Sequence, residues 1–219
     1  MSTSSRPFGL AHTLQHLYEG QSLMRIQMNI ALAEETIVGR VVDVGGGRSP
    51  DYFEYFCKGD QVTVDRIDAS LSGIDFEKDV LPYGSGNVDT IVLCNVLEHI
   101  YNYRFLMSEI QRVLAPGGRL IGVVPFWVGY HPDPHDYFRY TGEALEKILT
   151  EAGLSSIKIR PIGGGPVFAN FNTITLSFPR VVRPFLYLWY APWQWLFTYL
   201  RPESFGRQPL GFVFTASVK

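Results

Sequence analysis

VVDVGGGRSP, residues 41–50, is the part of this 219-residue chain from which the fold and a ligand site are most directly inferred. Val41, Val42 and Val44 form a short β-branched run that predicts a buried strand, and the glycines after it predict a tight turn. Pro50 then stands near the first turn of a predicted helix, where its missing N–H costs nothing. Such a strand, turn and helix bring backbone N–H groups close to a ligand, because glycine has no side chain to block the approach.

Predicted strands and helices alternate along the rest of the chain. Apolar residues recur at three- and four-residue steps over 10–36, which predicts helix, and Gly20 is expected to divide it into two. This alternation is typical of an α/β protein with a mainly parallel sheet and helices on both faces. We expect a helical cap over residues 1–39 and a single larger domain over 40–219. The further strands are expected at 61–64, 88–93, 120–124, 155–160 and 211–218, and the further helices at 51–57, 105–114 and 141–152.

The composition excludes several classes of protein. Apolar residues make up 46% of the chain and charged residues 18%, so disorder, collagen and coiled coil are excluded. The formal net charge is −2, so there is no basic field for phosphates and no nucleic acid partner is expected. Cys57 and Cys94 are too few for a disulfide framework. The N-terminal segment has no continuous apolar run, so we expect no signal peptide and a reducing, cytoplasmic location.

An acidic residue follows the glycine turn at a spacing that suggests a nucleoside ligand. The second predicted strand is expected to end at Asp65, about twenty residues beyond the first. A carboxylate there can accept hydrogen bonds from both ribose hydroxyls. The dinucleotide fingerprint G-x-G-x-x-G is not met, because Pro50 stands where its last glycine would be, and this disfavours an NAD-dependent dehydrogenase.

Five motifs in order resemble those of class I S-adenosylmethionine-dependent methyltransferases, with a type 11-like domain. VVDVGGGRSP is similar to their first motif, D-x-G-x-G after a strand, and VTVDRID resembles their second strand with its acidic end. DVLPYGSGNVDTIVLCNVLEHI resembles the adenine-side acid, the fourth strand and the turn after it, and EIQRVLAPGGRLIGVVPF the helix, PGG turn and fifth strand. The resemblance runs from about Arg40 to Arg160. It implies a Rossmann-like, seven-stranded, mostly parallel sheet whose last strand is antiparallel, and S-adenosylmethionine as cofactor.

The resemblance also implies a role for each residue that matches a family motif. The methionine end of the cofactor would face Asp43 and the glycine turn, Asp65 would hold the ribose, and Asn95 would lie under the sulfonium. Asp79 and the backbone of Val80 would lie at the adenine. The glycines of the turn are Gly45, Gly46 and Gly47.

The segment 127–141, WVGYHPDPHDYFRYT, carries the candidate catalytic residues. It follows the family's fifth strand, and loops after the carboxyl ends of parallel strands line the ligand crevice. An acceptor hydroxyl must lose a proton, and a histidine beside an aspartate can act as a general base near neutral pH. We expect that base to be His135, supported by Asp136, or else His99. A structural role is equally open, in which His135, Asp136 and Arg139 pin the loop to the following helix.

No metal site is expected from the sequence. His131 and His135 have the i, i+4 spacing that would pair them on a helix, as metal-binding histidines often are. Pro132 and Pro134 prevent an ordinary helix here, so the shape of the loop is expected to depend on the two proline rings.

Residues 161–210 form an aromatic-rich insert between the last two predicted strands. Within it, eight of the twenty residues of 181–200 are aromatic. The segment is nearly long enough to span a bilayer, but its prolines and polar residues argue against a span. Three interpretations remain open: an apolar lid over the substrate, an interfacial membrane anchor, and a dimer surface. Four arginines surround it, as anionic headgroups would favour: Arg180, Arg183, Arg201 and Arg207.

The sequence therefore predicts an S-adenosylmethionine-dependent methyltransferase. Its acceptor is expected to be a small molecule, a sugar or a lipid-linked glycan, methylated on oxygen or nitrogen. The alternative is a catalytically inactive methyltransferase-like module that binds the cofactor or a partner protein. We expect a cytoplasmic protein, held at the inner face of the membrane if 181–200 is an anchor, and a homodimer if that segment is a dimer surface.

Overall fold

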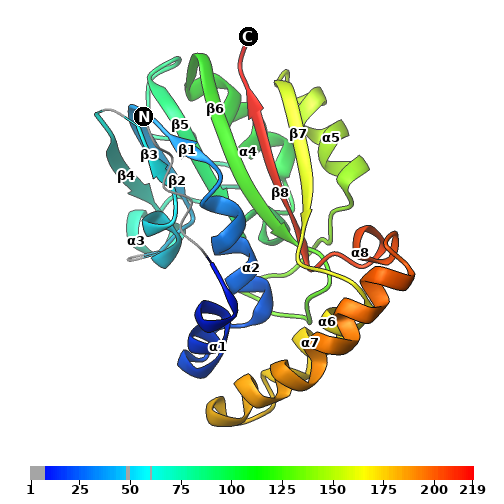
Figure 1. Ribbon diagram of the computed structural model, residues 1–219. Helices are drawn as coiled ribbons and strands as arrows, with labels where there is room; N and C mark the ends of the chain where they lie inside the picture. The colour runs from blue at the N-terminus through cyan, green and yellow to red at the C-terminus, as the bar shows by residue number, and fades with distance from the viewer. Residues whose placement is uncertain (1–7, 48–49, 60) are drawn as a thin grey trace.

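A six-stranded sheet forms the centre of the computed structural model, which describes residues 8–47, 50–59 and 61–219 (Figure 1). The strand order is β4-β2-β5-β6-β8-β7. β4, β2, β5 and β6 are mutually parallel, whereas β8 runs antiparallel to both β6 and β7. The expected α/β fold with a reversed last strand is therefore confirmed. The strands are β2 (Arg40–Val44), β4 (Thr63–Ile67), β5 (Val88–Cys94), β6 (Leu114–Pro125), β7 (Ser155–Ile162) and β8 (Gly211–Ser217).

The expectation of seven strands is corrected to six in this sheet over the described residues. The chain between β4 and β5 would have to supply the remaining strand. It instead forms the short helix α3 (Ala69–Ser72) and then turns. The physical reason is the composition of 73–87, where Gly73, Pro82, Gly84 and Gly86 interrupt any alternation of apolar and polar residues.

The buried side chains of the strands alternate between two cores, one on each face of the sheet. Val42 and Ile91 belong to a core that includes α4 (Tyr103–Val113) and α5 (Gly142–Glu151). Val41 and Val92 belong to the other core, which is closed by α2 (Leu23–Leu32). Successive residues of a strand point to opposite faces, and strands buried on both faces read as continuous apolar runs.

The N-terminal region forms two helices, as the sequence predicts, and adds a layer to the sheet. α1 (Leu10–Glu19) ends at Gly20, whose φ of 105° is the left-handed conformation that glycine adopts readily. The Ser22 side chain then caps α2 by accepting a hydrogen bond from the Arg25 backbone N–H. Leu23, Ile26 and Met28 of α2 are fully buried against the sheet. α1 and α2, which belong to the expected cap, thus share a core with strands β2 and β5 of the sheet.

Residues 51–57, expected to be a helix, form only the 3-10 turn η1 (Asp51–Glu54). Cys57–Lys58 then forms the short strand β3, which pairs in parallel with β1 (Thr36–Ile37). The Cys57 thiol is exposed and that of Cys94 is buried, and both are free.

The insert folds into a helical hairpin at the carboxyl end of the parallel strands. β7 ends at Ile162, and α6 (Pro166–Thr175) begins directly beyond it. After η3 (Arg180–Val182), α7 (Arg183–Leu200) packs along α6 and against α1, below the sheet in Figure 1. α8 (Ser204–Arg207) then leads back to β8. Across the described residues, every helix falls short of the length or apolar character that a bilayer crossing requires.

Candidate active site at the carboxyl edge of the sheet

The carboxyl ends of β2 and β5 meet at the point where the order of the sheet reverses. From β2 the chain passes to β4 on one side, and later to β5 on the other. In open α/β sheets ligands bind outside the carboxyl ends of the strands at such a point. The segments that gather here are the turn at 45–47, the residues after β5, and the loop 126–140 after β6.

Two glycines of the turn after β2, Gly45 and Gly46, lie where side chains would collide with their surroundings, whereas Gly47 has a φ of 68° and faces open space. Gly45 has a φ of 79°, and a Cβ there would collide with the Val96 side chain. A Cβ on Gly46 would overlap the Asp43 carboxylate and the Tyr52 hydroxyl. Glycine is therefore needed at position 46, because only a residue without a side chain can pass this close to the buried Asp43.

Asp43 is a fully buried carboxyl group directly before the turn. Its Oδ1 accepts a hydrogen bond of 2.6 Å from the Tyr52 hydroxyl, while Oδ2 has no partner among the described residues. Burial raises the pKa of Asp43 to about 7, against the opposing effects of the Tyr52 hydrogen bond and of Arg66 and Arg25. A buried acceptor without a donor carries a free-energy penalty that a cationic donor from a ligand would relieve.

The structure separates two acidic residues that the sequence places close together. Asp65 lies in the middle of β4, opposite Val42 of β2, and its Oδ2 lies 3.1 Å from the guanidinium of Arg40. Arg40 is the first residue of β2, so this ion pair lies away from the carboxyl edge. Asp68 directly follows Ile67, the last residue of β4, and its charge raises the pKa of Asp43. The acidic residue just beyond the strand end is therefore Asp68, whereas the sequence predicts this end at Asp65, two residues before Ile67.

Asp79 and Val80 lie in the turn region between α3 and β5. The Asp79 Oδ2 accepts a hydrogen bond of 2.9 Å from the backbone N–H of Asp75, and Val80 is 66% exposed. Glu77 in the same turn accepts from Tyr101 N–H, which lies beyond the carboxyl end of β5. This turn, where the adenine of the cofactor is expected, is thus held beside the segment that follows β5.

Asn95 follows β5 in the left-handed conformation, with a φ of 54°. Its backbone N–H bonds to the Val123 carbonyl of the neighbouring strand, and its Nδ2 lies 3.3 Å from the Met28 sulfur. The Oδ1 atom is buried without a partner among the described residues. Asparagine tolerates this backbone conformation better than most residues do, and here it leaves a second acceptor at the edge of the sheet.

The loop 126–140 is tied to the segment after β5. The backbone N–H groups of Tyr137 and Phe138 both donate to the carbonyl of Glu98, and the Tyr140 hydroxyl bonds to the Leu97 carbonyl. These bonds hold the loop against η2 (Leu97–His99).

Asp136 and His135, expected to act as a pair, have different partners. Asp136 makes a two-pronged ion pair with Arg139, with Nη2 to Oδ2 at 2.7 Å, and accepts from the His131 backbone N–H at 3.0 Å. The Arg139 guanidinium holds the pKa of Asp136 well below its usual range. The His135 ring is exposed and packs against Tyr137, with 5.3 Å between ring centroids. Asp136 thus orders the loop through Arg139.

Three chemistry-bearing side chains meet beneath this loop. Glu98 is fully buried, and both its carboxylate oxygens lack a hydrogen-bond partner among the described residues. Its Oε1 lies 3.6 Å from Nε2 of His99 and 4.0 Å from Nε2 of His131. Burial raises the pKa of Glu98 to about 8. His99 was predicted from the sequence, but Glu98 was not, because its only signal there is its place beside His99 in LEHI.

Comparison with known proteins agrees with this geometry. The profile of a family described as a methyltransferase domain matches residues 15–159. No curated protein matches the chain significantly.

Solved structures with similar folds lie at low sequence identity, which shows the fold alone. They include the [4+2]-cyclase SpnF, at 17% identity and a TM-score of 0.57, with 98% of this chain and 94% of that chain covered. Haemonchus contortus phosphoethanolamine N-methyltransferase 2 in complex with S-adenosylmethionine has 16% identity and a TM-score of 0.54, with 100% and 60% covered. A methyltransferase from Aquifex aeolicus has 14% identity and a TM-score of 0.53, with 94% and 98% covered. Because the family profile spans most of the chain, the protein belongs to the methyltransferase-domain family and is an S-adenosylmethionine-dependent methyltransferase.

Proposed function

We propose that the protein methylates an oxygen or nitrogen of a small-molecule, sugar or lipid-linked acceptor that enters at the carboxyl edge of the sheet. The observation that carries the proposal is the Asp43 carboxyl group, buried beneath Gly46 with one oxygen left without a donor. When bound, S-adenosylmethionine supplies a methyl group on a positively charged sulfur; the acceptor would bond to the methyl carbon, and the sulfur would leave with the electrons of the C–S bond. The protein's task is to hold the two reactants in line and to accept a proton.

The residues around the edge match the parts of this cofactor in turn. Asp43 would accept a hydrogen bond from its amino group, beside the open glycine turn. Asp68 would accept from the ribose hydroxyls, a role for which its position at the end of β4 makes it a better candidate than Asp65. Asp79 with Val80 would border the adenine. Asn95 would lie near the sulfonium.

His135 is the candidate general base of the loop. Its exposed ring is open to an acceptor, whereas the His99 ring is hydrogen-bonded to the His135 carbonyl through Nδ1. Asp136 acts as a positioning residue, since its carboxylate holds Arg139 and the His131 backbone. In this proposal Asp136 orders the loop, and His135 accepts the proton from the acceptor.

Ligand binding tests the proposed site, and Asp65 supplies a matched control. We expect S-adenosylmethionine and S-adenosylhomocysteine to raise the melting temperature, because a ligand at a hundred times its Kd stabilises a protein by about 2.7 kcal/mol. NAD is expected to cause no shift. Asp68→Asn should weaken binding by about 10-fold, the value of one charge-assisted hydrogen bond, whereas Asp65→Asn should leave it unchanged. A larger loss with Asp65→Asn would return the ribose role to that residue, and no shift with either adenosyl ligand would contradict the proposed site.

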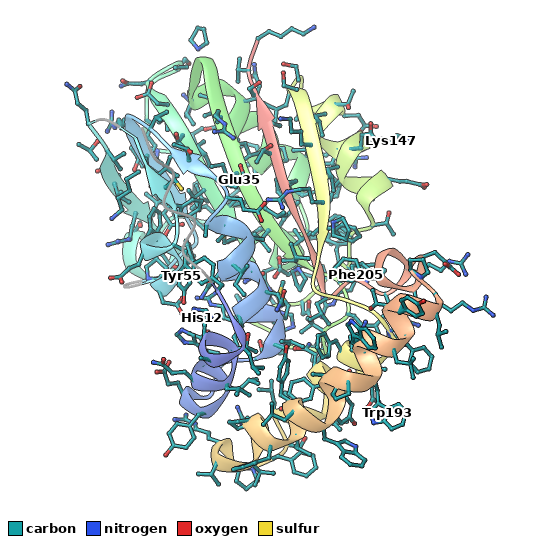
Figure 2. All side chains as sticks on the ribbon, viewed as in Figure 1. His12, Glu35, Tyr55, Lys147, Trp193 and Phe205 are labelled. Carbon is teal, nitrogen blue, oxygen red and sulfur yellow. The ribbon has the colours of Figure 1, made fainter. Side chains whose placement is uncertain are left out.

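The outer face of α7 favours membrane contact as a second part of the function. Trp189 is 69% exposed and Trp195 70%, and Trp193 points away from the sheet in Figure 2. Tryptophan and tyrosine are enriched where a membrane meets water. The exposed apolar side chains of the helix include Phe185, Trp189, Trp193, Trp195, Tyr199 and Leu200.

The arginines around α7 divide into two groups. Arg183 is buried and donates to the backbone carbonyls of Gly20, Leu176 and Phe178, so it holds the hairpin to α1. Arg180, Arg201 and Arg207 are exposed and are available to anionic headgroups. We therefore propose that α7 lies in the membrane interface and brings the site to a lipid-linked acceptor.

Vesicle sedimentation tests this surface. The purified protein is expected to co-sediment with anionic vesicles at low salt, and the double change Trp189→Ala and Trp193→Ala should reduce the bound fraction. Tyr101→Ala is the control, because Tyr101 is 65% exposed but lies outside α7. Equal sedimentation with and without vesicles would rule out the membrane surface. A sedimentation coefficient that rises with protein concentration, and falls in the tryptophan variant, would instead indicate a dimer surface.

A further inference from the structure

Glu98, His99 and His131 form a compact set of potential ligands for a metal ion. One potential ligand atom from each residue lies within 4.8 Å of the other two. Two atoms that are each about 2.1 Å from one ion lie at most about 4.2 Å apart. The Glu98 Oε1 distances to the two histidine Nε2 atoms, 3.6 and 4.0 Å, are within that span. A small rotation of His131, whose side chain is 39% exposed, would close the third distance.

Backbone carbonyls orient both imidazole rings toward this point. Nδ1 of His99 bonds to the His135 carbonyl, and Nδ1 of His131 lies 2.8 Å from the Gly129 carbonyl. A carbonyl oxygen only accepts, so a bond to it uses Nδ1 as the donor and leaves Nε2 to bind a metal; Nη2 of Arg139 also lies 3.4 Å from Nδ1 of His131. Metal-binding histidines commonly donate their other N–H to a carbonyl or carboxylate in this way.

Glu98 supplies the independent sign of a missing cation. Its side chain is completely buried, and neither carboxylate oxygen accepts a hydrogen bond from any other residue that the structure describes. A buried carboxyl group in a folded protein is normally paired, bound to a metal or neutralised by a proton, because removing a lone charge from water is costly. The Arg139 guanidinium nearby is already engaged by both oxygens of Asp136.

We propose that Glu98, His99 and His131 bind a divalent first-row transition metal, of which Zn²⁺ is the best match. Two imidazoles and one carboxylate are a ligand set that Zn²⁺ accepts while keeping one coordination position open. No metal site was predicted from the sequence, because only the pair His131 and His135 was considered. In the fold, His131 instead lies beside His99, which is 32 positions earlier in the chain.

The metal's open position would face the same edge of the sheet as the proposed cofactor site. There the ion would bind an acceptor oxygen and lower the pKa of an acceptor hydroxyl, as Lewis-acid metals do. This use of the ion rests on the proposed methyl transfer, but the presence of the metal site does not.

Metal titration of the chelator-treated full-length protein tests the site. We expect one equivalent of Zn²⁺ to bind, and Co²⁺ to give the visible absorption of a site with nitrogen and oxygen ligands. Glu98→Gln, His99→Ala and His131→Ala should each weaken Zn²⁺ binding by about 100-fold. Removing a residue that only supports a metal ligand already weakens binding by about 10- to 100-fold, and removing the ligand itself should cost no less. His135→Ala is the matched control, because it removes a histidine of the same loop while keeping the backbone carbonyl that holds His99. The control should bind Zn²⁺ as the unaltered protein does.

His131→Ala keeps the test decisive if Glu98→Gln fails to fold, because His131 is half-exposed and its loss leaves the core intact. Unchanged Zn²⁺ affinity in His131→Ala, or equal losses in His131→Ala and His135→Ala, would overturn the proposal. Thermal shifts with S-adenosylmethionine, measured without metal, distinguish its failure from failure of the proposed function. If the protein binds the cofactor but no metal, the metal site is disproved and the proposed function is not.

Discussion

Asp43→Asn is expected to weaken S-adenosylmethionine binding by about 10- to 100-fold, because a hydrogen bond to a charged group contributes about 1.5–3 kcal/mol. The variant keeps the size of the side chain and the acceptor that the Tyr52 hydroxyl uses. It removes the negative charge beside the position proposed for the cofactor's ammonium group. Isothermal titration calorimetry at pH 8 measures the change directly.

The same carboxyl group predicts a pH dependence. Its pKa is raised to about 7, so the fraction of Asp43 that is ionised falls as the pH drops below that value. The charged groups that act on it are Arg66, Arg25 and Asp68, and the Tyr52 hydroxyl bonds to it. Cofactor affinity of the unaltered protein should therefore fall between pH 8 and pH 6, and Asp43→Asn should not share this dependence on Asp43 ionisation.

Stability provides the folding control for this variant. The native pKa of Asp43 exceeds the value of about 3.9 for an unperturbed aspartate, so the native state binds this proton more tightly than the unfolded state. This contribution to stability is therefore fully present below about pH 4 and is lost as the pH rises to about 7. Asp43→Asn, which cannot ionise, should melt no lower than the unaltered protein at pH 8. Unchanged cofactor affinity in a folded Asp43→Asn protein would contradict the assigned role.

Arg139→Ala is expected to lower the free energy of unfolding by about 3 kcal/mol. The Asp136 side chain is only 2% exposed, and the change removes the cation that both its oxygens contact. The His131 backbone N–H would remain as a donor, but a nearly buried charge would lose its counterion. For a chain of this length, the loss corresponds to a fall in melting temperature of roughly 6–12 °C.

Denaturant unfolding of this variant has a matched control in Arg104→Ala. Arg104 is an exposed arginine on α4, and its removal should change stability by no more than about 0.5 kcal/mol. Arg139→Lys should recover part of the loss, since lysine restores the charge but not the two-pronged geometry. A loss below about 1 kcal/mol in Arg139→Ala would show that the loop does not depend on the Asp136–Arg139 pair.

Local patterns in the chain were sufficient for the elements whose structure depends on neighbouring residues. Val41, Val42 and Val44 predict a buried strand wherever they pack, and Gly20 ends a helix by adopting a conformation that other residues resist. The glycine turn after β2 follows from the same local chemistry, since any Cβ on Gly46 would collide with Asp43. The fold class could therefore be inferred from these local patterns, whereas the cofactor was implied by the resemblance of five motifs to those of a known family.

Other features depend on contacts between residues that are far apart in the chain, which no local sequence pattern can show. These features are where the strands end, which charged groups are buried, and which residues they contact. Asp65 and Asp68 are equivalent in sequence, and only the pairing of β4 with β2 shows which of them reaches the ligand edge. In the sequence Arg183 resembles a membrane-facing arginine. In the structure it is buried and donates a hydrogen bond to the Gly20 carbonyl at the end of α1.

The cluster of Glu98, His99 and His131 shows the same distinction most clearly. The residue types are visible in the chain, but 32 positions separate the two histidines. Backbone hydrogen bonds from Tyr137 and Phe138 to the Glu98 carbonyl bring them together. Short-range preferences thus specify the strands, turns and helix ends of this protein. Its reactive groups meet through long-range contacts, because those contacts form only when the sheet and its loops are assembled.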